Sequence, residues 1–127
     1  MSTNKAAVLQ MIEQQMKETQ RHIKTLQSQQ EDLLGSIQAM HDIKNVAVGS
    51  EILVPITNGI FVKGTLQEKD NVIVNIGAQT AVTKTLADAR ELLEQQYKEV
   101  EQVVVQLTQD LQELYAQAQQ VEQELAK

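Results

Sequence analysis

The chain has 127 residues and a formal net charge of −6, a length that is typical of one domain. The absence of cysteine excludes a disulfide framework, a thiolate zinc site and a cysteine nucleophile. One Phe and two Tyr are too few for a mixed aromatic core or for a surface that stacks nucleic-acid bases, so the core must be aliphatic.

The negative charge is concentrated in the last third of the chain. Residues 85–127 hold three Lys or Arg against nine Asp or Glu, whereas residues 1–45 hold five of each. Nucleic acids and anionic membranes are bound by clustered positive charge, and the sequence has no basic stripe. It also begins without the apolar run of a signal peptide, and no stretch approaches the roughly 18 apolar residues of a membrane span. We expect a soluble, cytoplasmic protein that binds neither nucleic acid nor membrane and whose partners are proteins.

Residues 1–45 are predicted to form one long helix. Ser2, Thr3 or Asn4 can cap its start, and no proline interrupts it. Apolar residues recur every 3.5 positions, a spacing that keeps one narrow seam facing a partner helix in a coiled coil. Gly35 falls outside this seam. The predicted seam positions are Leu9, Ile12, Met16, Thr19, Ile23, Leu26, Gln30, Leu33, Ile37 and Met40.

Residues 50–84 predict two β-hairpins. Asn58-Gly59 separates the first two strands and readily takes the positive φ angles of a type I′ turn, and residues 77–79 separate a second pair. Leu53, Phe61 and Ile73 are apolar on the opposite side of the strands, so both sides of a four-stranded sheet would need to be covered, in part by neighbouring subunits. The main apolar face consists of Ile52, Val54, Ile56, Ile60, Val62, Val72, Val74 and Ile76.

Residues 85–127 are predicted to form a second long helix of matched length. Thr85 is the expected N-cap, with Asp88 three residues later in a variant of the capping box. Only Arg90 interrupts the second apolar seam. Its positions are Leu86, Arg90, Leu93, Tyr97, Val100, Val104, Leu107, Leu111, Leu114, Ala118, Val121 and Leu125. The predicted fold is α+β and mainly α: one domain over residues 1–127, in which a long antiparallel coiled-coil hairpin joins its helices through two small β-hairpins.

No residue pattern predicts catalysis. His22 and His41 would lie roughly 28 Å apart on one helix and could not share a metal ion. The serines lack the context of a nucleophile elbow, and Gly77 stands outside any phosphate-loop pattern. We therefore expect no enzymatic activity, no metal and no cofactor.

The free ends of the helices form the most promising candidate for a binding surface. If the helices are antiparallel, their ends meet at a tip, where fraying should be greatest and a splayed seam would offer flexible apolar contacts to varied partners. The alternative is that these residues simply complete the seam. The candidates are Val8, Leu9, Met11, Ile12, Leu114, Ala118, Val121 and Leu125.

The order of long helix, two hairpins and long helix resembles the alpha-class subunits of the prefoldin family, and two hairpins favour the alpha class over the beta class. The resemblance is carried by Glu51-Ile-Leu-Val-Pro-Ile56, Gly59-Ile-Phe-Val-Lys-Gly64, Val72-Ile-Val-Asn-Ile-Gly77, Thr80-Ala-Val82 and Ala87-Asp-Ala89. It implies a hexamer of two alpha and four beta subunits, in which the hairpins assemble into an oligomeric β-barrel.

The same resemblance implies a function and its partners. Prefoldins hold non-native proteins without ATP and pass them to a group II chaperonin. The apolar strand residues would then serve oligomerisation with beta-class subunits, and the tip residues would bind unfolded client proteins. Two alternatives are a coiled-coil scaffold or adaptor subunit that binds one defined partner, and a gamma-type prefoldin, which assembles into filaments.

Overall fold

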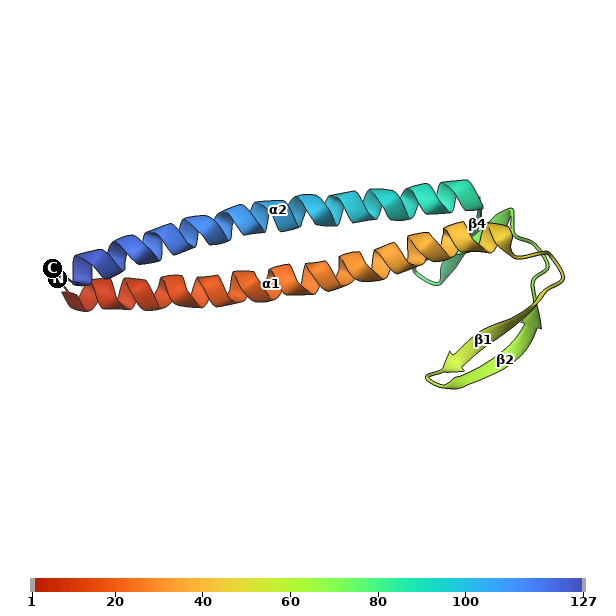
Figure 1. Ribbon diagram of the computed structural model, residues 1–127, viewed down its shortest axis with the longest axis horizontal. Helices are drawn as coiled ribbons and strands as arrows, with labels where there is room; N and C mark the ends of the chain where they lie inside the picture. The colour runs from red at the N-terminus through yellow and green to blue at the C-terminus, as the bar shows by residue number, and fades with distance from the viewer. Residues whose placement is uncertain (1, 127) are drawn as a thin grey trace. The chain divides into compact units, whose positions relative to one another are not determined.

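A computed structural model describes the backbone of residues 2–126 and the side chains of residues 4–126. In chain order, two antiparallel strand pairs lie between two long helices, as predicted (Figure 1). The elements are α1 (Ser2–Asp42), a 3-10 turn (Ile43–Asn45), β1 (Glu51–Thr57), β2 (Ile60–Thr65), β3 (Asn71–Gly77), β4 (Thr80–Thr85) and α2 (Leu86–Leu125).

The chain divides into two compact units, each of which contains part of both helices. We call residues 1–32 with residues 97–127 the terminal unit, and residues 33–96 the central unit. The predicted single domain over residues 1–127 stays a prediction. The central unit contains all four strands.

In the terminal unit the two helix segments run antiparallel. Lys5, early in α1, forms an ion pair of 3.5 Å with Glu124, late in α2. Further along, the Gln20 side-chain amide donates a hydrogen bond of 2.7 Å to the Tyr115 hydroxyl. Both contacts join exposed side chains beside the seam, so they set the alignment of the helices more than they add to stability.

The predicted heptad seams are confirmed by burial. Every predicted seam position from Leu9 to Met40 and from Leu86 to Leu125 is half-buried or buried, including the polar residues Thr19, Gln30 and Arg90. The positions between them are exposed with few exceptions, and Gly35 faces open space. This narrow stripe is what a period of 3.5 residues produces when two helices pack along one line.

The seam does not open toward the ends of the described helices. Ile12 is 8% exposed and Ala118 is 7% exposed, which makes them the buried residues among those of the terminal unit whose side chains are described. Val121 and Leu125 remain half-buried. The expected splaying is therefore wrong for these residues. A small side chain such as Ala118 lets two helix backbones approach closely, and the Lys5–Glu124 ion pair flanks the same region.

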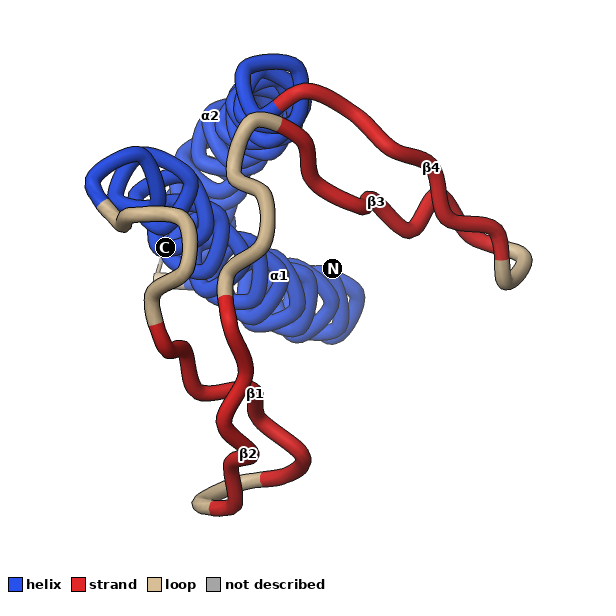
Figure 2. Tube along the Cα trace, turned by 90° about the vertical axis from the view of Figure 1, so that its right-hand side faces the viewer, coloured by secondary structure: helices blue, strands red, loops and turns tan. Residues whose placement is uncertain are grey.

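The four strands form two separate two-stranded sheets, and the four-stranded sheet expected from the sequence is wrong (Figure 2). β1 pairs with β2, and β3 pairs with β4. The segment between the hairpins is held by hydrogen bonds of its own. Lys69 donates hydrogen bonds of 3.0 and 3.1 Å from its Nζ to the backbone oxygens of Lys44 and Val46, which fixes this segment to the end of α1.

The turn at the end of the first hairpin differs from the predicted type I′. Of its two residues, Gly59 alone has a positive φ, at +81°, and the strand register shifts between Pro55 and Thr57. These features fit a three-residue loop that closes with a glycine bulge. The prediction of a hairpin is confirmed, whereas the type I′ turn is wrong here.

The second hairpin carries the type I′ pattern instead. Ala78 and Gln79 have φ angles of +49° and +61°, and Gly77, immediately before them, lies at +100°. Neither central residue is the glycine or asparagine that this turn prefers. The Asn75 side-chain oxygen accepts a hydrogen bond of 2.9 Å from the Gly77 N–H and so supports the bend.

Candidate functional site

The eight apolar strand residues predicted to serve oligomerisation fall on one face of each hairpin. In β1–β2 the pair Val54 and Val62 lie opposite each other, and in β3–β4 the corresponding pair is Val74 and Val82. Because side chains alternate along a strand, the other predicted residues share these faces. Ile52, Val72 and Val74 are half-buried, whereas Val54, Ile56, Ile60, Val62 and Ile76 are exposed in the single chain.

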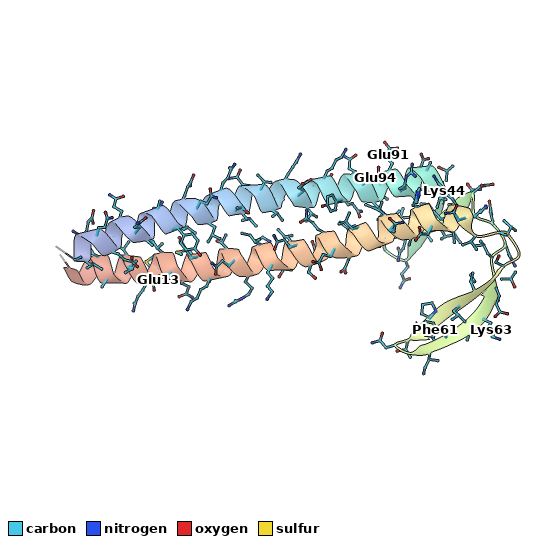
Figure 3. All side chains as sticks on the ribbon, viewed as in Figure 1. Glu13, Lys44, Phe61, Lys63, Glu91 and Glu94 are labelled. Carbon is cyan, nitrogen blue, oxygen red and sulfur yellow. The ribbon has the colours of Figure 1, made fainter. Side chains whose placement is uncertain are left out.

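The opposite faces of the two hairpins are not alike. In β1–β2, Leu53 is 61% exposed and Phe61 is 53% exposed, and Pro55 is paired with Phe61. Phe61 and Lys63 both extend from β2 (Figure 3). In β3–β4 the corresponding pair is Asn75 with Ala81, and the one large apolar residue is Ile73. The first hairpin thus exposes several large apolar side chains on each face, whereas the second exposes one on each, Ile76 on its main face and Ile73, at 79%, on the other.

The roots of the strands are fixed by local hydrogen bonds within the central unit. The Thr85 hydroxyl accepts a bond of 3.1 Å from the Asp88 N–H, which confirms Thr85 as the N-cap of α2. The Leu86 N–H donates a hydrogen bond of 2.9 Å to the backbone oxygen of Asp70. The Leu66 N–H donates one of the same length to the backbone oxygen of Ser50. The roots of both hairpins are therefore fixed by hydrogen bonds, while Val54, Ile56, Ile60, Val62 and Ile76 stay exposed.

A mostly apolar cavity of about 350 Å³ adjoins the root of the second hairpin. It lies where the end of α1, β3 and the start of α2 meet. Its lining residues are Ser36, Ala39, Met40, Ile43, Val72 and Leu86. Val72, one of the predicted assembly residues, forms part of this wall, so the apolar face of β3 continues toward the helix bases.

The eight predicted tip residues divide into two groups. Val8 is 45% exposed and Met11 is 63% exposed, and both lie outside the seam on α1. The other six, Leu9, Ile12, Leu114, Ala118, Val121 and Leu125, are half-buried or buried in the seam. The structure thus brings two of the eight to the surface as available apolar side chains.

The sequence reasoning missed apolar residues that lie outside the seam on α2. Val103 and Val105 are exposed on either side of the seam residue Val104, and Tyr115 is exposed beside Leu114. The signal was present in the run Val103-Val-Val105, because two of three consecutive valines in a helix cannot share a narrow seam with the third.

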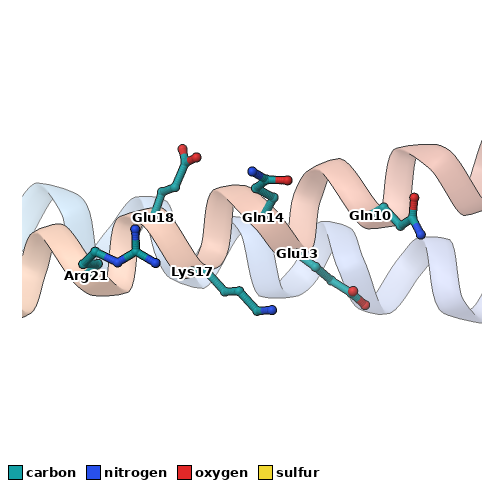
Figure 4. A pocket seen from close by; sticks show the side chains of 6 residues that line it. All are labelled: Gln10, Glu13, Gln14, Lys17, Glu18 and Arg21. Carbon is teal, nitrogen blue, oxygen red and sulfur yellow. The ribbon is translucent and has the colours of Figure 1, made fainter.

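The polar hollows of the terminal unit show no convergent chemistry. One, of about 410 Å³, follows an exposed face of α1 and is lined by Gln10, Glu13, Gln14, Lys17, Glu18 and Arg21. Its side chains point in different directions, with Glu18 and Lys17 on opposite sides of the helix (Figure 4). Among the described residues, no group of three or more His, Cys, Asp or Glu is placed to hold a metal ion. No helix in the described part of the chain is long and apolar enough to cross a membrane.

Comparison with known proteins agrees with this architecture. Residues 12–127 match the family described as prefoldin subunit. The chain is 30% identical over 112 residues to prefoldin subunit alpha of Thermofilum pendens, which covers 88% of this chain and 87% of that protein. It is 24% identical over 122 residues to prefoldin subunit alpha of Archaeoglobus fulgidus, covering 96% of this chain and 89% of that one.

A solved structure has the same fold. A filamentous PFD from Methanocaldococcus jannaschii, determined by cryo-EM, superposes with a TM-score of 0.81 over 91% of this chain and 96% of that chain, at 22% identity. The resemblance predicted from the strand block is thereby confirmed. With its relatives among the alpha subunits and both hairpins in place, this chain belongs to the prefoldin family.

Proposed function

We propose that this chain is the alpha-class subunit of an ATP-independent holdase, which captures non-native proteins at its coiled-coil tips and delivers them to a group II chaperonin. Membership of the prefoldin family supports the chaperone role. The observation that carries the proposal is the pair of hairpins, fixed at their roots by hydrogen bonds, on which five of the eight predicted assembly residues are exposed in the single chain.

The hairpins are proposed to assemble with beta-class subunits into a hexamer of two alpha and four beta chains, closed as a β-barrel. A two-stranded sheet with exposed large apolar residues is at best marginally stable alone, and its open edges offer backbone groups for pairing. The main apolar face, from Ile52 to Ile76, would face the barrel interior. The opposite face of β1–β2, with Leu53 and Phe61, would be covered by a further subunit surface.

Client capture is proposed to begin at Val8 and Met11. Both are exposed apolar side chains near the free end of α1, and Met is flexible enough to fit varied contacts. The remaining six tip candidates complete the seam and hold the end of the arm in shape. Contacts of this size are individually weak, so binding depends on several arms acting on one client. No ATP, metal or cofactor takes part in this proposal, and its setting is the cytoplasm.

The test is a reconstituted complex with a beta-class prefoldin subunit. We expect the complex to slow the aggregation of several unrelated unfolded proteins without ATP. The double variant Val8→Ser/Met11→Ser should assemble normally but hold clients more weakly. The matched control is Leu34→Ser, which removes an exposed apolar side chain from the same helix within the central unit. Equal loss in both variants would contradict a specific role for the tip.

The other readings make different predictions in the same experiment. A scaffold or adaptor subunit would bind one defined partner and leave the aggregation of unrelated proteins unchanged. A gamma-type subunit would form long filaments alone, which native mass measurement of the chain with and without the beta-class partner would detect.

A further inference from the structure

The end of the first hairpin carries an exposed Asn-Gly sequence in an open turn. Asn58 and Gly59 are both exposed, and Gly59 has a φ of +81°. A Cβ atom built at Gly59 would meet nothing within 4 Å beyond its two neighbours in the chain, so the rest of the protein does not crowd this residue. Nothing but hydrogen shields the Gly59 nitrogen on its own Cα side, because glycine has no side chain.

This arrangement permits a known reaction of asparagine, a thermally labile residue. The Gly59 backbone nitrogen attacks the Asn58 side-chain carbon Cγ, the new N–C bond forms a five-membered succinimide, and ammonia leaves. Water then opens the ring at either carbonyl. The product is either an ordinary aspartyl residue in a normal chain, or an isoaspartyl residue in which the backbone runs through the former side chain. The net change is the uptake of one water and the release of one ammonia.

The remaining asparagines of the chain are placed less favourably. Asn45, Asn71 and Asn75 precede Val46, Val72 and Ile76, whose branched side chains shield the following nitrogen, and Asn4 precedes Lys5 in a helix. Two of them also have engaged side chains. The Asn71 side-chain amide donates a hydrogen bond to a Glu68 carboxylate oxygen. The Asn75 side-chain oxygen accepts a hydrogen bond from the Gly77 N–H. Within the described chain, no hydrogen bond restrains the Asn58 side chain in the same way.

We propose that Asn58 is a self-modifying site, at which the unassembled chain converts its turn amide into an acid. The product places a negative charge, and in the isoaspartyl form an extra backbone atom, beside the exposed Ile56 and Ile60. Burying such a charge against an apolar partner is costly. Chains that wait too long for partners thus become poorer at assembly. This last consequence rests on the proposed function, whereas the reaction itself does not.

The first experiment follows the free chain during incubation at mildly alkaline pH, with peptide mass spectrometry and an isoaspartyl-specific assay. We expect Asn58 to convert at least about tenfold faster than any other asparagine, because it is the one asparagine in the sequence that is followed by a glycine. Asn58→Gln is the control, since glutamine would need a larger ring and should abolish the conversion. Conversion of Asn58 at the rate of the other asparagines would overturn the proposal.

The second experiment repeats the incubation in the complex with a beta-class subunit. We expect conversion to slow by roughly tenfold in the complex, and Asn58→Asp to bind partners about tenfold more weakly than the unmodified chain. Equal rates in both states would overturn the link to assembly. A complex that protects Asn58 but fails to hold clients would instead contradict the proposed holdase, so the two failures are separable.

Discussion

The two hairpins share one backbone plan and differ in what they present to their surroundings. Each pair in β1–β2 has a counterpart 20 residues later in β3–β4: Glu51 with Thr65 corresponds to Asn71 with Thr85, and the register shifts at the same place. The backbone hydrogen bonds at the roots of the hairpins also correspond: the Leu66 N–H donates to the Ser50 oxygen in the first, and the Leu86 N–H donates to the Asp70 oxygen in the second. The repeated unit therefore fixes strand pairing, while individual side chains decide what each hairpin touches.

The differences fall in three places. The first hairpin has Phe61 and Leu53 on its second face where the other has Ala81 and Ile73. Their turns differ, and only the second hairpin leads directly into a helix. Exchanging single residues between equivalent positions separates these effects.

The largest effect is expected from Phe61→Ala, which gives the first hairpin the residue of the second. If a subunit covers this face, loss of a large buried aromatic should weaken assembly by about 2 kcal/mol or more. The free chain should change by less than about 0.5 kcal/mol, because Phe61 is exposed there. Titration with a beta-class partner measures the first value, and denaturant unfolding measures the second.

The exchange in the other direction is the control. Ala81→Phe adds the same side chain at the equivalent position of the second hairpin and should leave assembly nearly unchanged. Unchanged affinity in Phe61→Ala would show that the second face of β1–β2 stays open to solvent.

A smaller effect is expected from Thr85→Ala. The Thr85 hydroxyl caps α2, and loss of such a cap costs about 1 kcal/mol. Thr65 occupies the equivalent position but precedes a linker, so Thr65→Ala should be neutral. Thermal unfolding followed by circular dichroism compares the two variants, and equal losses would mean that threonine acts through the strand instead of the helix.

The turn exchange Gln79→Gly should be stabilising. Gln79 holds a φ of +61°, a conformation that costs a non-glycine residue about 1 kcal/mol and costs glycine little. We expect slower amide hydrogen exchange in β3 and β4, since local opening becomes less favourable. Faster exchange would show that the Gln79 side chain contributes a contact that outweighs the backbone strain.

The smallest effect is expected from Lys63→Thr, which again copies the second hairpin. The Lys63 Nζ lies 3.7 Å from a carboxylate oxygen of Glu51, and both side chains are well exposed. Surface ion pairs of this kind contribute at most about 0.5 kcal/mol and weaken with salt. The free energy of unfolding, measured at low and at high salt, should be nearly the same for the variant and the unmodified chain. A large loss of stability that depends on salt would contradict this expectation.

The sequence was most informative where one physical rule acted alone. Every residue that the 3.5-residue period placed in the seam is half-buried or buried, including Arg90, because burial along a narrow line follows from spacing. The period missed Ala89, which is only 2% exposed. It failed at the turns. Asn58-Gly59 satisfied the residue preference of a type I′ turn, yet only Gly59 takes a positive φ there. The type I′ pattern arose instead at Ala78-Gln79 without favourable residues, although the strand register shifts at the equivalent place in both hairpins.

The candidate site was only partly readable for a similar reason. Heptad position distinguishes seam from surface, so it could have separated Val8 and Met11 from Ile12. It could not reveal that Ile12 and Ala118 close the seam tightly, because that depends on how side chains of unequal size fit across two helices. The 20-residue repeat between hairpins was also present in the sequence, but its pairs diverge so far, as Phe61 and Ala81 do, that only the register makes it visible.

The hydrogen bonds from Lys69 to the backbone oxygens of Lys44 and Val46 have a consequence for how freely the first hairpin can vary in length. They bring the two ends of the β1–β2 excursion to one point, so the first hairpin leaves and rejoins the chain at almost the same place. Closing a longer or shorter loop between fixed ends alters the folding entropy only slowly with length. A change in the length of the first hairpin should therefore leave the attachment of the linker to the end of α1 in place.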